Sequence, residues 1–339
     1  VIDPNLSGAD VLDARLTTRL SAETFTPWLT KLTEDGIDQV LLPLEGSCDV
    51  ELAVGVGSMT SVRFGSDFQG LAINLPSPLG KIQAAKTPFS ASLELAQVER
   101  LQVFWQDRVN ALAQGDGHFL EQVIIDLTPT TEPATVSPLG DGLHVTGRLP
   151  GIDIQPWLDS PLATWLTTEV LSSEELSNEE LSSEEQPPIA VFVDALKIDQ
   201  FSLGSRQIGK TEINAERFEG WDGWRMTTPW LDAALTLPIK GDPTLIINDI
   251  DLDRLPAEMD DDTGDTWSPP RLPRPLTVVV ANMRLGEEFL GAVRFDLNSD
   301  GQSLRLTELS GNLIDIDLLE GSQLEWQSTD DGEARTTLV

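Results

Sequence analysis

Acidic side chains supply most of the residues whose type and spacing could do chemistry. The string Asp260–Asp265 gathers carboxylates on a turn-forming sequence, which is the ligand type that Ca²⁺ prefers. It lacks the Asp-x-Asp-x-Asp-Gly order and the later Glu of a helix-loop-helix calcium site. We therefore interpret this string as part of a solvated loop.

Carboxylates also recur at a spacing of two, at 249, 251 and 253 and again at 315 and 317. On a strand this spacing places them on one face, as a pair of glycosidase carboxylates would require. The chain has 56 Asp and Glu residues, however, and an outward strand face in such a protein has the same pattern. We interpret these sets as surface positions.

Nucleophilic catalysis has little support in the sequence. Ser58 is not in a Gly-x-Ser-x-Gly elbow, and Cys48 lies among acidic neighbours whose field raises the pKa of a thiol. His118 and His144 each follow a turn signal and are interpreted as surface residues. No phosphate loop or dinucleotide fingerprint is present. We expect no catalytic residue, no metal and no cofactor.

Three tryptophans, Trp221, Trp224 and Trp230, cluster in the sequence near Arg225. Such a group can stack on a sugar or a lipid headgroup, but more often it packs at a sheet edge.

Composition excludes several classes of partner. With 22 Lys and Arg against 56 Asp and Glu, the formal net charge is −34. This balance argues against nucleic acid, whose phosphates require basic residues, and against anionic lipid headgroups. The single Cys excludes an internal disulfide, and no apolar run approaches the length of a membrane span.

The elements that must position these residues are strands, because the dominant hydrophobic period is two. Examples are 50–56, 71–75, 293–297, 304–306 and 314–318. This alternation predicts antiparallel sheet with one apolar and one wet face. Asp-Gly, a hairpin signal, occurs at 35–36, 116–117, 141–142, 222–223, 300–301 and 331–332.

Two stretches read as short helices, near 21–32 and 156–171. Two internal repeats accompany them. Arg-Leu followed six residues later by Pro-Trp-Leu occurs at 19–29 and 148–158, and a Leu-Gly unit occurs at 203–209 and 285–291. Repeats of this kind suggest related hairpin units in an extended sheet.

An acidic low-complexity segment divides the chain. Leu-Ser-Ser/Asn-Glu-Glu repeats every five residues, which gives no continuous apolar face on a helix or a strand. We predict a segment over 1–170, a linker or loop over 171–188, and a second segment over 189–339. The stretch 259–275 reads as another long loop. Few helices are predicted to cover the apolar strand faces. Two sheets could therefore pack against each other as a sandwich, or the apolar face could stay open to a ligand, and the hydrophobic period does not distinguish these two arrangements.

A resemblance to a known family bears on that choice. The segment 65–81, Gly-Ser-Asp-Phe-Gln-Gly-Leu-Ala-Ile-Asn-Leu-Pro-Ser-Pro-Leu-Gly-Lys, resembles a signature of the YhdP family within the AsmA-like group that includes TamB. The stretch 146–158, the two Leu-Gly units and Gly-Trp-Asp-Gly-Trp at 220–224 are similar to further elements of that family. The matches run in the family's order from about 16 to 318.

The resemblance implies a mainly β fold, an extended, twisted antiparallel sheet curled into a repeating β-groove with a few short helices. It implies part of a bridge-like periplasmic protein, held in the inner membrane by a segment outside this chain, that carries phospholipid acyl chains to the outer membrane. Expected partners are those acyl chains, the rest of the same longer chain and membrane proteins of either bilayer. The candidate groove-lining residues are Val50, Leu52, Val54, Leu71, Ile73, Leu75, Val278, Val280, Phe295, Leu297, Leu304 and Leu306.

Two other functions stay open from the sequence. One is a scaffold or assembly factor for outer-membrane proteins that binds barrel strands at a sheet edge. The other is an acidic β-fold protein that binds or cleaves polysaccharide.

Overall fold

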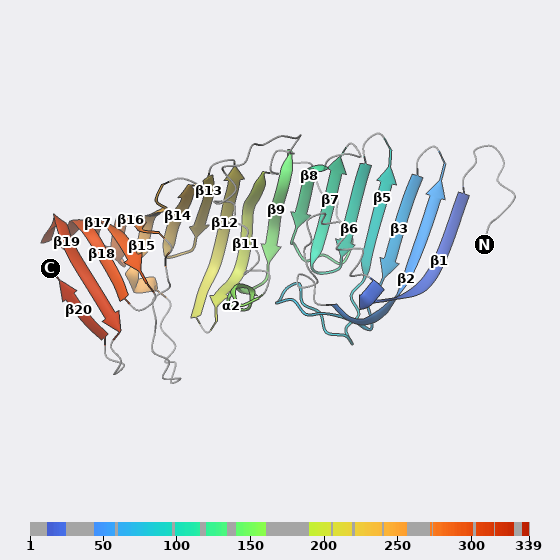
Figure 1. Ribbon diagram of the computed structural model, residues 1–339, viewed down its shortest axis with the longest axis horizontal. Coiled ribbons are helices and arrows are strands. Elements are labelled where there is room, and N and C mark those ends of the chain that lie inside the picture. The colour runs from blue at the N-terminus through green and yellow to red at the C-terminus, as the bar shows by residue number, and fades with distance from the viewer. Residues whose placement is uncertain are drawn as a thin grey trace, which may run out of the picture. The chain divides into compact units, whose positions relative to one another are not determined.

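A computed structural model gives the fold of the chain (Figure 1). The residues it describes are 12–24, 44–57, 60–96, 99–115, 120–133, 140–160, 190–204, 206–218, 221–238, 241–255, 272, 274–300, 303–314, 316–328 and 334–338.

The chain is mainly β, as predicted, and divides into two compact units. Unit 1 comprises 1–189 with 202–204, and unit 2 comprises 190–201 with 205–339. The strands before the division are β1 (Leu12–Ser21), β2 (Leu44–Val56), β3 (Thr60–Ser66), β4 (Leu71–Ile73), β5 (Phe89–Leu95), β6 (Glu99–Trp105), β7 (Val109–Gly115), β8 (Leu120–Asp126), β9 (Gly142–Leu149) and β10 (Ile152–Asp153). Those after it are β11 (Val191–Leu203), β12 (Arg206–Phe218), β13 (Trp221–Thr227), β14 (Leu231–Pro238), β15 (Thr244–Asp251), β16 (Leu276–Leu285), β17 (Glu288–Ser299), β18 (Ser303–Leu313), β19 (Ile316–Ser328) and β20 (Ala334–Leu338).

In unit 1 the strands β1, β2, β3, β5, β6, β7 and β8 pair in that order, each antiparallel to the next. The pair β8–β9 is parallel instead. A parallel partner requires a crossover connection, and residues 127–141 provide it. The short β4 pairs with the start of β2.

Unit 2 repeats this plan. Strands β12 to β15 are antiparallel neighbours, β15 and β16 are parallel, and β16 to β20 are again antiparallel. The connection from β15 to β16 begins with a 3-10 turn, η1 (Leu252–Arg254). The sheet is therefore mixed, and the expectation of purely antiparallel pairing is wrong at the two crossovers. Alternation within a strand carries no information about the direction of its neighbour.

Two of the Asp-Gly hairpin predictions are wrong. Gly142 opens β9 after the crossover, with a positive φ of 109°, so 141–142 joins parallel strands. The pair 222–223 lies inside β13, where Asp222 stands opposite Leu237 of β14. Neighbouring tryptophans favour a strand over a turn there. By contrast, Asp300 follows β17 and accepts a hydrogen bond from the Ser303 N–H at 2.7 Å, as expected of a hairpin turn.

The alternation predicted over 314–318 is interrupted at its start. Ile314 has a φ of +47° and lies between β18 and β19. Its N–H donates to the carbonyl of Leu290 at 2.8 Å, so the backbone bends to reach the neighbouring hairpin. A strand over 316–318 remains, as the start of β19.

Helix is limited to single turns in the described residues. Residues 22–24 are helical, and α2 covers Gln155–Leu158. The rest of the two predicted helices, the linker 171–188 and most of the loop 259–275 lie outside the described residues. The Trp157 indole N–H donates to the Ser77 carbonyl at 2.9 Å, which fixes α2 on the segment after β4.

Candidate functional site

Strand register aligns apolar side chains across unit 1. Paired positions on neighbouring strands point to the same side of a sheet. One row therefore runs across eight strands without a charged residue. This first row is Leu16, Leu52, Phe64, Ala91, Val103, Ala111, Ile125 and Val145.

A second row lies two residues further along each strand, on the same side. It is also wholly apolar: Ala14, Val54, Val62, Leu93, Leu101, Ala113, Val123 and Leu143. We call the surface made by the two rows the apolar face of unit 1.

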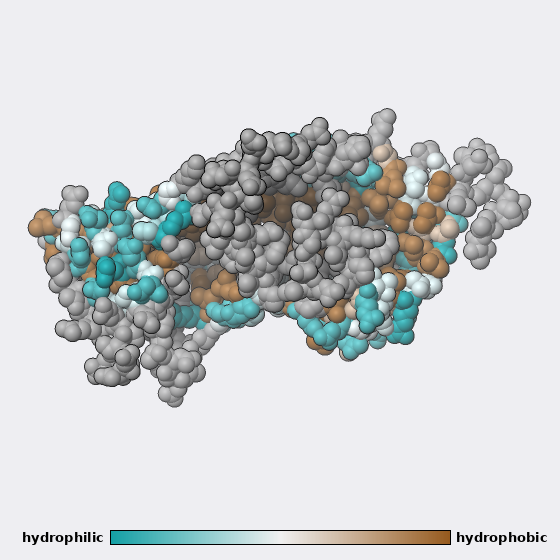
Figure 2. Space-filling model, in the orientation of Figure 1, coloured by the Kyte–Doolittle hydropathy of each residue, from teal (hydrophilic) through white to brown (hydrophobic). Residues whose placement is uncertain are grey.

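The apolar face is not sealed. None of the side chains in either row is buried; most are half-buried, and Leu16 and Leu101 are exposed to 57% and 37%. Figure 2 shows hydrophobic residues gathered over β1 to β3 on the side turned to the viewer. A sandwich core would reduce these exposed fractions to a few per cent, comparable to the 2% of Val50, which is covered by another segment of the chain. Within the described part of unit 1, the apolar face is thus open.

The opposite side of the same strands is polar over β1 to β5, whereas Leu112 of β7 and Ile124 of β8 are fully buried on it. Arg15, Arg63 and Arg100 alternate there with neutral and acidic residues. Over β1 to β3 this side has a hollow of about 690 Å³, where Lys86 lies 3.4 Å from Asp67 and Arg19 lies 3.8 Å from Asp49. The charges that strand positions contribute are therefore concentrated away from the apolar face.

One edge of the apolar face is closed by protein. Residues after β3 fold back so that Phe68 and Leu71 pack on Cys48 and Val50, forming a buried cluster. Phe68 stacks on Phe89 with ring centroids 4.7 Å apart. The segment resembling the family signature is thus a wall along one margin of the sheet.

A buried lysine holds this wall together. The Lys81 ammonium donates to the carbonyls of Phe68 and Leu71 at 2.7 Å each and to that of Ile82 at 3.1 Å. Burial, and next the charge of Arg108, lower the pKa of Lys81. Arg108 in turn donates to the Pro78 carbonyl and lies over the Trp105 ring at 4.9 Å. Both cations therefore have their contacts with backbone carbonyls or with an aromatic ring at the wall.

Unit 2 has a comparable apolar side with a more closed centre. Val278, Val280 and Val293 are buried, and Leu245, Phe295 and Leu297 pack around them. Outside this centre the same side is more open. Trp224, aligned with Leu235 and Leu245, is 46% exposed.

The structure distributes the twelve sequence-predicted lining residues over three environments. Leu52 and Val54 lie in the rows of unit 1. Val50 is buried under the wall, Leu71 and Ile73 are buried within it, and Leu75 is half-buried in the same segment. The remaining candidates are on the apolar side of unit 2: Val278, Val280, Phe295, Leu297, Leu304 and Leu306.

Most residues of the rows were missed by sequence reasoning. Phe64, Ala91, Val103 and Ala111 occupy the middle of the first row. The signal was available in 90–95, where Ser-Ala-Ser-Leu-Glu-Leu alternates strictly. Small residues such as alanine weaken the hydrophobic pattern, although they leave the face apolar.

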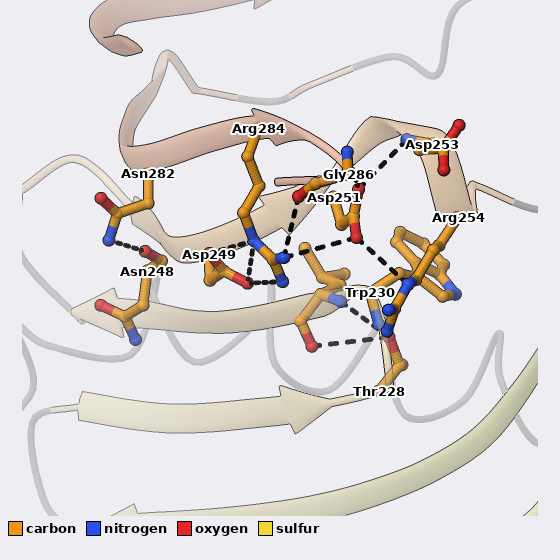
Figure 3. A network of polar contacts seen from close by, with 11 residues as sticks. Thr228, Trp230, Asn248, Asp249, Asp251, Asp253, Arg254, Asn282, Arg284 and Gly286 are labelled. Carbon is orange, nitrogen blue, oxygen red and sulfur yellow. Dashed lines mark hydrogen bonds and ion pairs between the residues drawn. The ribbon is translucent and has the colours of Figure 1, made fainter. Parts of the chain in front are cut away.

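Asp249 and Asp251, two of the carboxylates noted in the sequence, both form ion pairs with Arg284. Arg284 makes a bidentate contact with Asp249, with Nη2 2.8 Å from Oδ2, and lies 3.5 Å from the Asp251 carboxylate (Figure 3). The hydrogen bonds from Arg284, the first cause, and its charge lower the pKa of Asp249. Asp251 is fully buried and also lies 3.2 Å from Arg254 Nε. This is the geometry of a structural ion-pair network.

The other candidates for chemistry are also used structurally. Cys48 is fully buried, and burial, above all, raises the pKa of its thiol. His144, predicted at the surface, is instead only 7% exposed, and its Nε2 lies 3.3 Å from the Asp141 carbonyl oxygen. The Trp230 indole donates to the Ile208 carbonyl at 3.1 Å. His118, Asp260–Asp265 and Asp315 lie outside the described residues.

Fold and site together define a β-sheet protein whose first unit has an open apolar face. The chain belongs to the YhdP family, whose model matches residues 7–337. This is a lipid-transport family. Comparison with curated proteins and with solved structures gave no match. In the part of the chain that the structure describes, no helix is both long and apolar enough to cross a bilayer.

Proposed function

We propose that this chain carries phospholipid acyl chains on the apolar face of unit 1 and on the corresponding side of unit 2. The observation that supports this most is the exposure of two complete apolar rows in unit 1. Large open apolar patches on a protein mark a binding surface. Because the chain belongs to a lipid-transport family, we infer that the ligand of this surface is a lipid.

The physical basis is simple. Burial of a CH₂ group gains about 0.8 kcal/mol wherever it is removed from water. An apolar strip therefore holds an acyl chain without a specific contact. A chain can also slide along such a strip, since neither row contains a charge that would interrupt it. The proposal includes a periplasmic location for the chain, between the inner and outer membranes.

The test is lipid binding by variants of one strand. In β6, Val103 is in the first row and Gln102 faces the opposite side. We expect Val103→Asp to lose most of the lipid that co-purifies with the 339-residue chain, measured by mass spectrometry of extracts. Gln102→Asp adds the same charge on the other side and should retain it.

Circular dichroism and a denaturant titration confirm that both variants are folded. The proposal fails if the unmodified chain takes up no phospholipid from vesicles. It also fails if folded Val103→Asp binds as much lipid as Gln102→Asp.

A further inference from the structure

Two neighbouring hairpin ends in unit 2 carry large apolar side chains that are open to solvent. One is the end of the β16–β17 hairpin, and the other is the end of the β18–β19 hairpin. Five aliphatic or aromatic residues there are exposed to between 48% and 75%: Leu285, Phe289, Ile314, Ile316 and Leu319. We call these five residues the hairpin patch.

The backbone holds the two hairpin ends side by side. Gly291 of β17 is paired with Leu313 of β18, so the second hairpin continues the sheet next to the first. The Ile314 N–H also donates to the Leu290 carbonyl at 2.8 Å, which ties the second turn to the strand that leaves the first. The hairpin patch therefore comes from two adjoining turns at one edge of the sheet.

Ile314 is placed against two physical preferences at once. Its φ of +47° lies in the left-handed region, which β-branched residues rarely adopt because their Cβ crowds the backbone. Its side chain is 62% exposed, so the fold gains little from burying it. Glycine or asparagine would suit both the backbone and the exposure better. Strain of this kind is typical of functional positions, which favours a contact made outside the chain.

The turn at the other end of these strands has an ordinary polar composition. Residues 298–303, at the junction of β17 and β18, are Asn-Ser-Asp-Gly-Gln-Ser. Single exposed apolar residues are normal on a protein surface, whereas several together beside charged residues mark an interaction site. The hairpin patch is of the second kind.

The free charges beside the hairpin patch are acidic. Glu287 and Glu288 are both exposed in the turn between β16 and β17. The arginines at this edge are already ion-paired, since Arg284 Nη1 and Arg254 Nε lie 3.5 and 3.2 Å from the Asp251 carboxylate (Figure 3). The surroundings of the patch therefore attract cationic groups and repel anionic ones.

We propose that the hairpin patch binds a segment of another protein in which large apolar residues are flanked by Lys or Arg. The apolar side chains of such a segment remove the patch from water, and its cations face Glu287 and Glu288. A second copy of this chain is a poorer match, because the same acidic residues and a net charge of −34 would meet themselves. An anionic bilayer is disfavoured for the same reason.

Binding of two labelled model peptides tests the docking. One peptide contains Leu and Lys and the other Leu and Glu, with the same length and helical spacing. Fluorescence anisotropy with the 339-residue chain should show binding of the Leu/Lys peptide only. Phe289→Ser with Ile316→Ser should weaken this binding about tenfold or more, since a few large apolar anchors dominate such interfaces. Ile82→Ser is the control, because Ile82 is 72% exposed in unit 1, and it should leave the affinity unchanged.

Two further double variants separate the local charge from the overall charge. Glu287→Gln with Glu288→Gln should weaken binding of the Leu/Lys peptide roughly two- to fivefold, the range of exposed ion pairs. Glu51→Gln with Glu132→Gln removes the same charge from exposed positions of unit 1 and should leave the affinity unchanged. Equal weakening by the two pairs would overturn the role of the acidic residues beside the patch.

The remaining outcomes each have a distinct meaning. Unchanged peptide affinity in Phe289→Ser with Ile316→Ser, folded by circular dichroism, overturns the docking, as does equal binding of the Leu/Glu peptide. Flotation with phosphatidylcholine vesicles or self-association in light scattering that this double variant loses would assign the patch to a bilayer or to a second copy, and would overturn a protein partner. Phospholipid uptake by the double variant should match that of the unmodified chain, so the docking and the proposed function fail separately.

Discussion

The buried carboxylate of Asp251, at the end of β15, accepts a hydrogen bond from the N–H of Gly286 at 3.0 Å. Gly286 lies 35 residues later, in the turn between β16 and β17. Unit 1 has the same arrangement, since Asp153 accepts from the N–H of Gly204 at 2.8 Å. The two Leu-Gly units found in the sequence are therefore the partners of an aspartate at the end of an earlier strand. In each case the bond ties that strand to a later turn.

Replacement of Asp251 tests how much the negative charge of its carboxylate contributes. Asp251→Asn keeps the shape but removes the charge that faces Arg254 and Arg284. We expect a loss of about 1–3 kcal/mol in the free energy of unfolding, measured by urea titration. Asp253→Asn, an exposed position on the same turn, should change it by less than about 0.5 kcal/mol. Equal effects of the two variants would contradict a special role for Asp251.

Lys81 should stabilise the wall through its three carbonyl contacts. Lys81→Met leaves these oxygens without their charged donor, and we expect a loss of about 2–3 kcal/mol. Lys86→Met is the control, because Lys86 is exposed and lies 3.4 Å from Asp67. It should change stability by less than about 0.5 kcal/mol.

The pH dependence of Lys81 has a defined sign. Its pKa is lowered in the folded state, so between that value and the unfolded value of about 10.4 the unfolded chain binds more protons. The stability difference between the unmodified chain and Lys81→Met should therefore grow as the pH rises through this window. Urea titrations across alkaline pH measure it, and a difference that shrinks would rule out the buried ammonium as the cause.

Alanine at the last glycine of each Leu-Gly unit should lower the free energy of unfolding by different amounts. Both have positive φ, 96° at Gly209 and 141° at Gly291. A Cβ at Gly209 would meet open space, whereas at Gly291 it would overlap the Asn312 carbonyl. Gly209→Ala should cost about 1–2 kcal/mol through backbone strain alone. Gly291→Ala should cost at least about 2 kcal/mol more by thermal or urea unfolding, and similar values would show that β18 moves aside freely.

Cys48 should be unreactive in the folded protein. Burial raises the pKa of its thiol, and the side chain is fully covered by the wall. A thiol reagent such as 5,5′-dithiobis(2-nitrobenzoate) should modify it only as fast as the wall opens. The modification rate should therefore rise with urea in parallel with local unfolding. Rapid modification in native buffer would show that the wall does not seal this edge.

Sequence patterning gave the strands reliably where alternation was strong. Val50 to Val56 is the core of β2, and Val293 to Leu297 lies within β17. Patterning did not give strand direction, because the alternation within β8 and β9 is the same whether the two strands pair in parallel or antiparallel. The raised pKa of the Cys48 thiol was foreseen from its acidic neighbours, although burial is the larger cause.

The candidate site was only partly accessible from sequence. Leu52 and Val54 were found because large aliphatic residues alternate around them. Leu71 and Ile73 alternate equally well, yet they lie in the wall, since burial depends on contacts distant in sequence. Val103 was not singled out, because its place in the first row is visible only once β5, β6 and β7 are in register.

The parallel steps keep the apolar side on the same surface of the sheet. Val123 is paired with Leu143 across one step, and Leu245 with Val278 across the other. A block of strands with its crossover can therefore be duplicated or deleted while the apolar side chains of the other strands stay on the same side of the sheet. The number of strands in such a sheet is adjustable in whole modules, so that gene duplication alone could lengthen it.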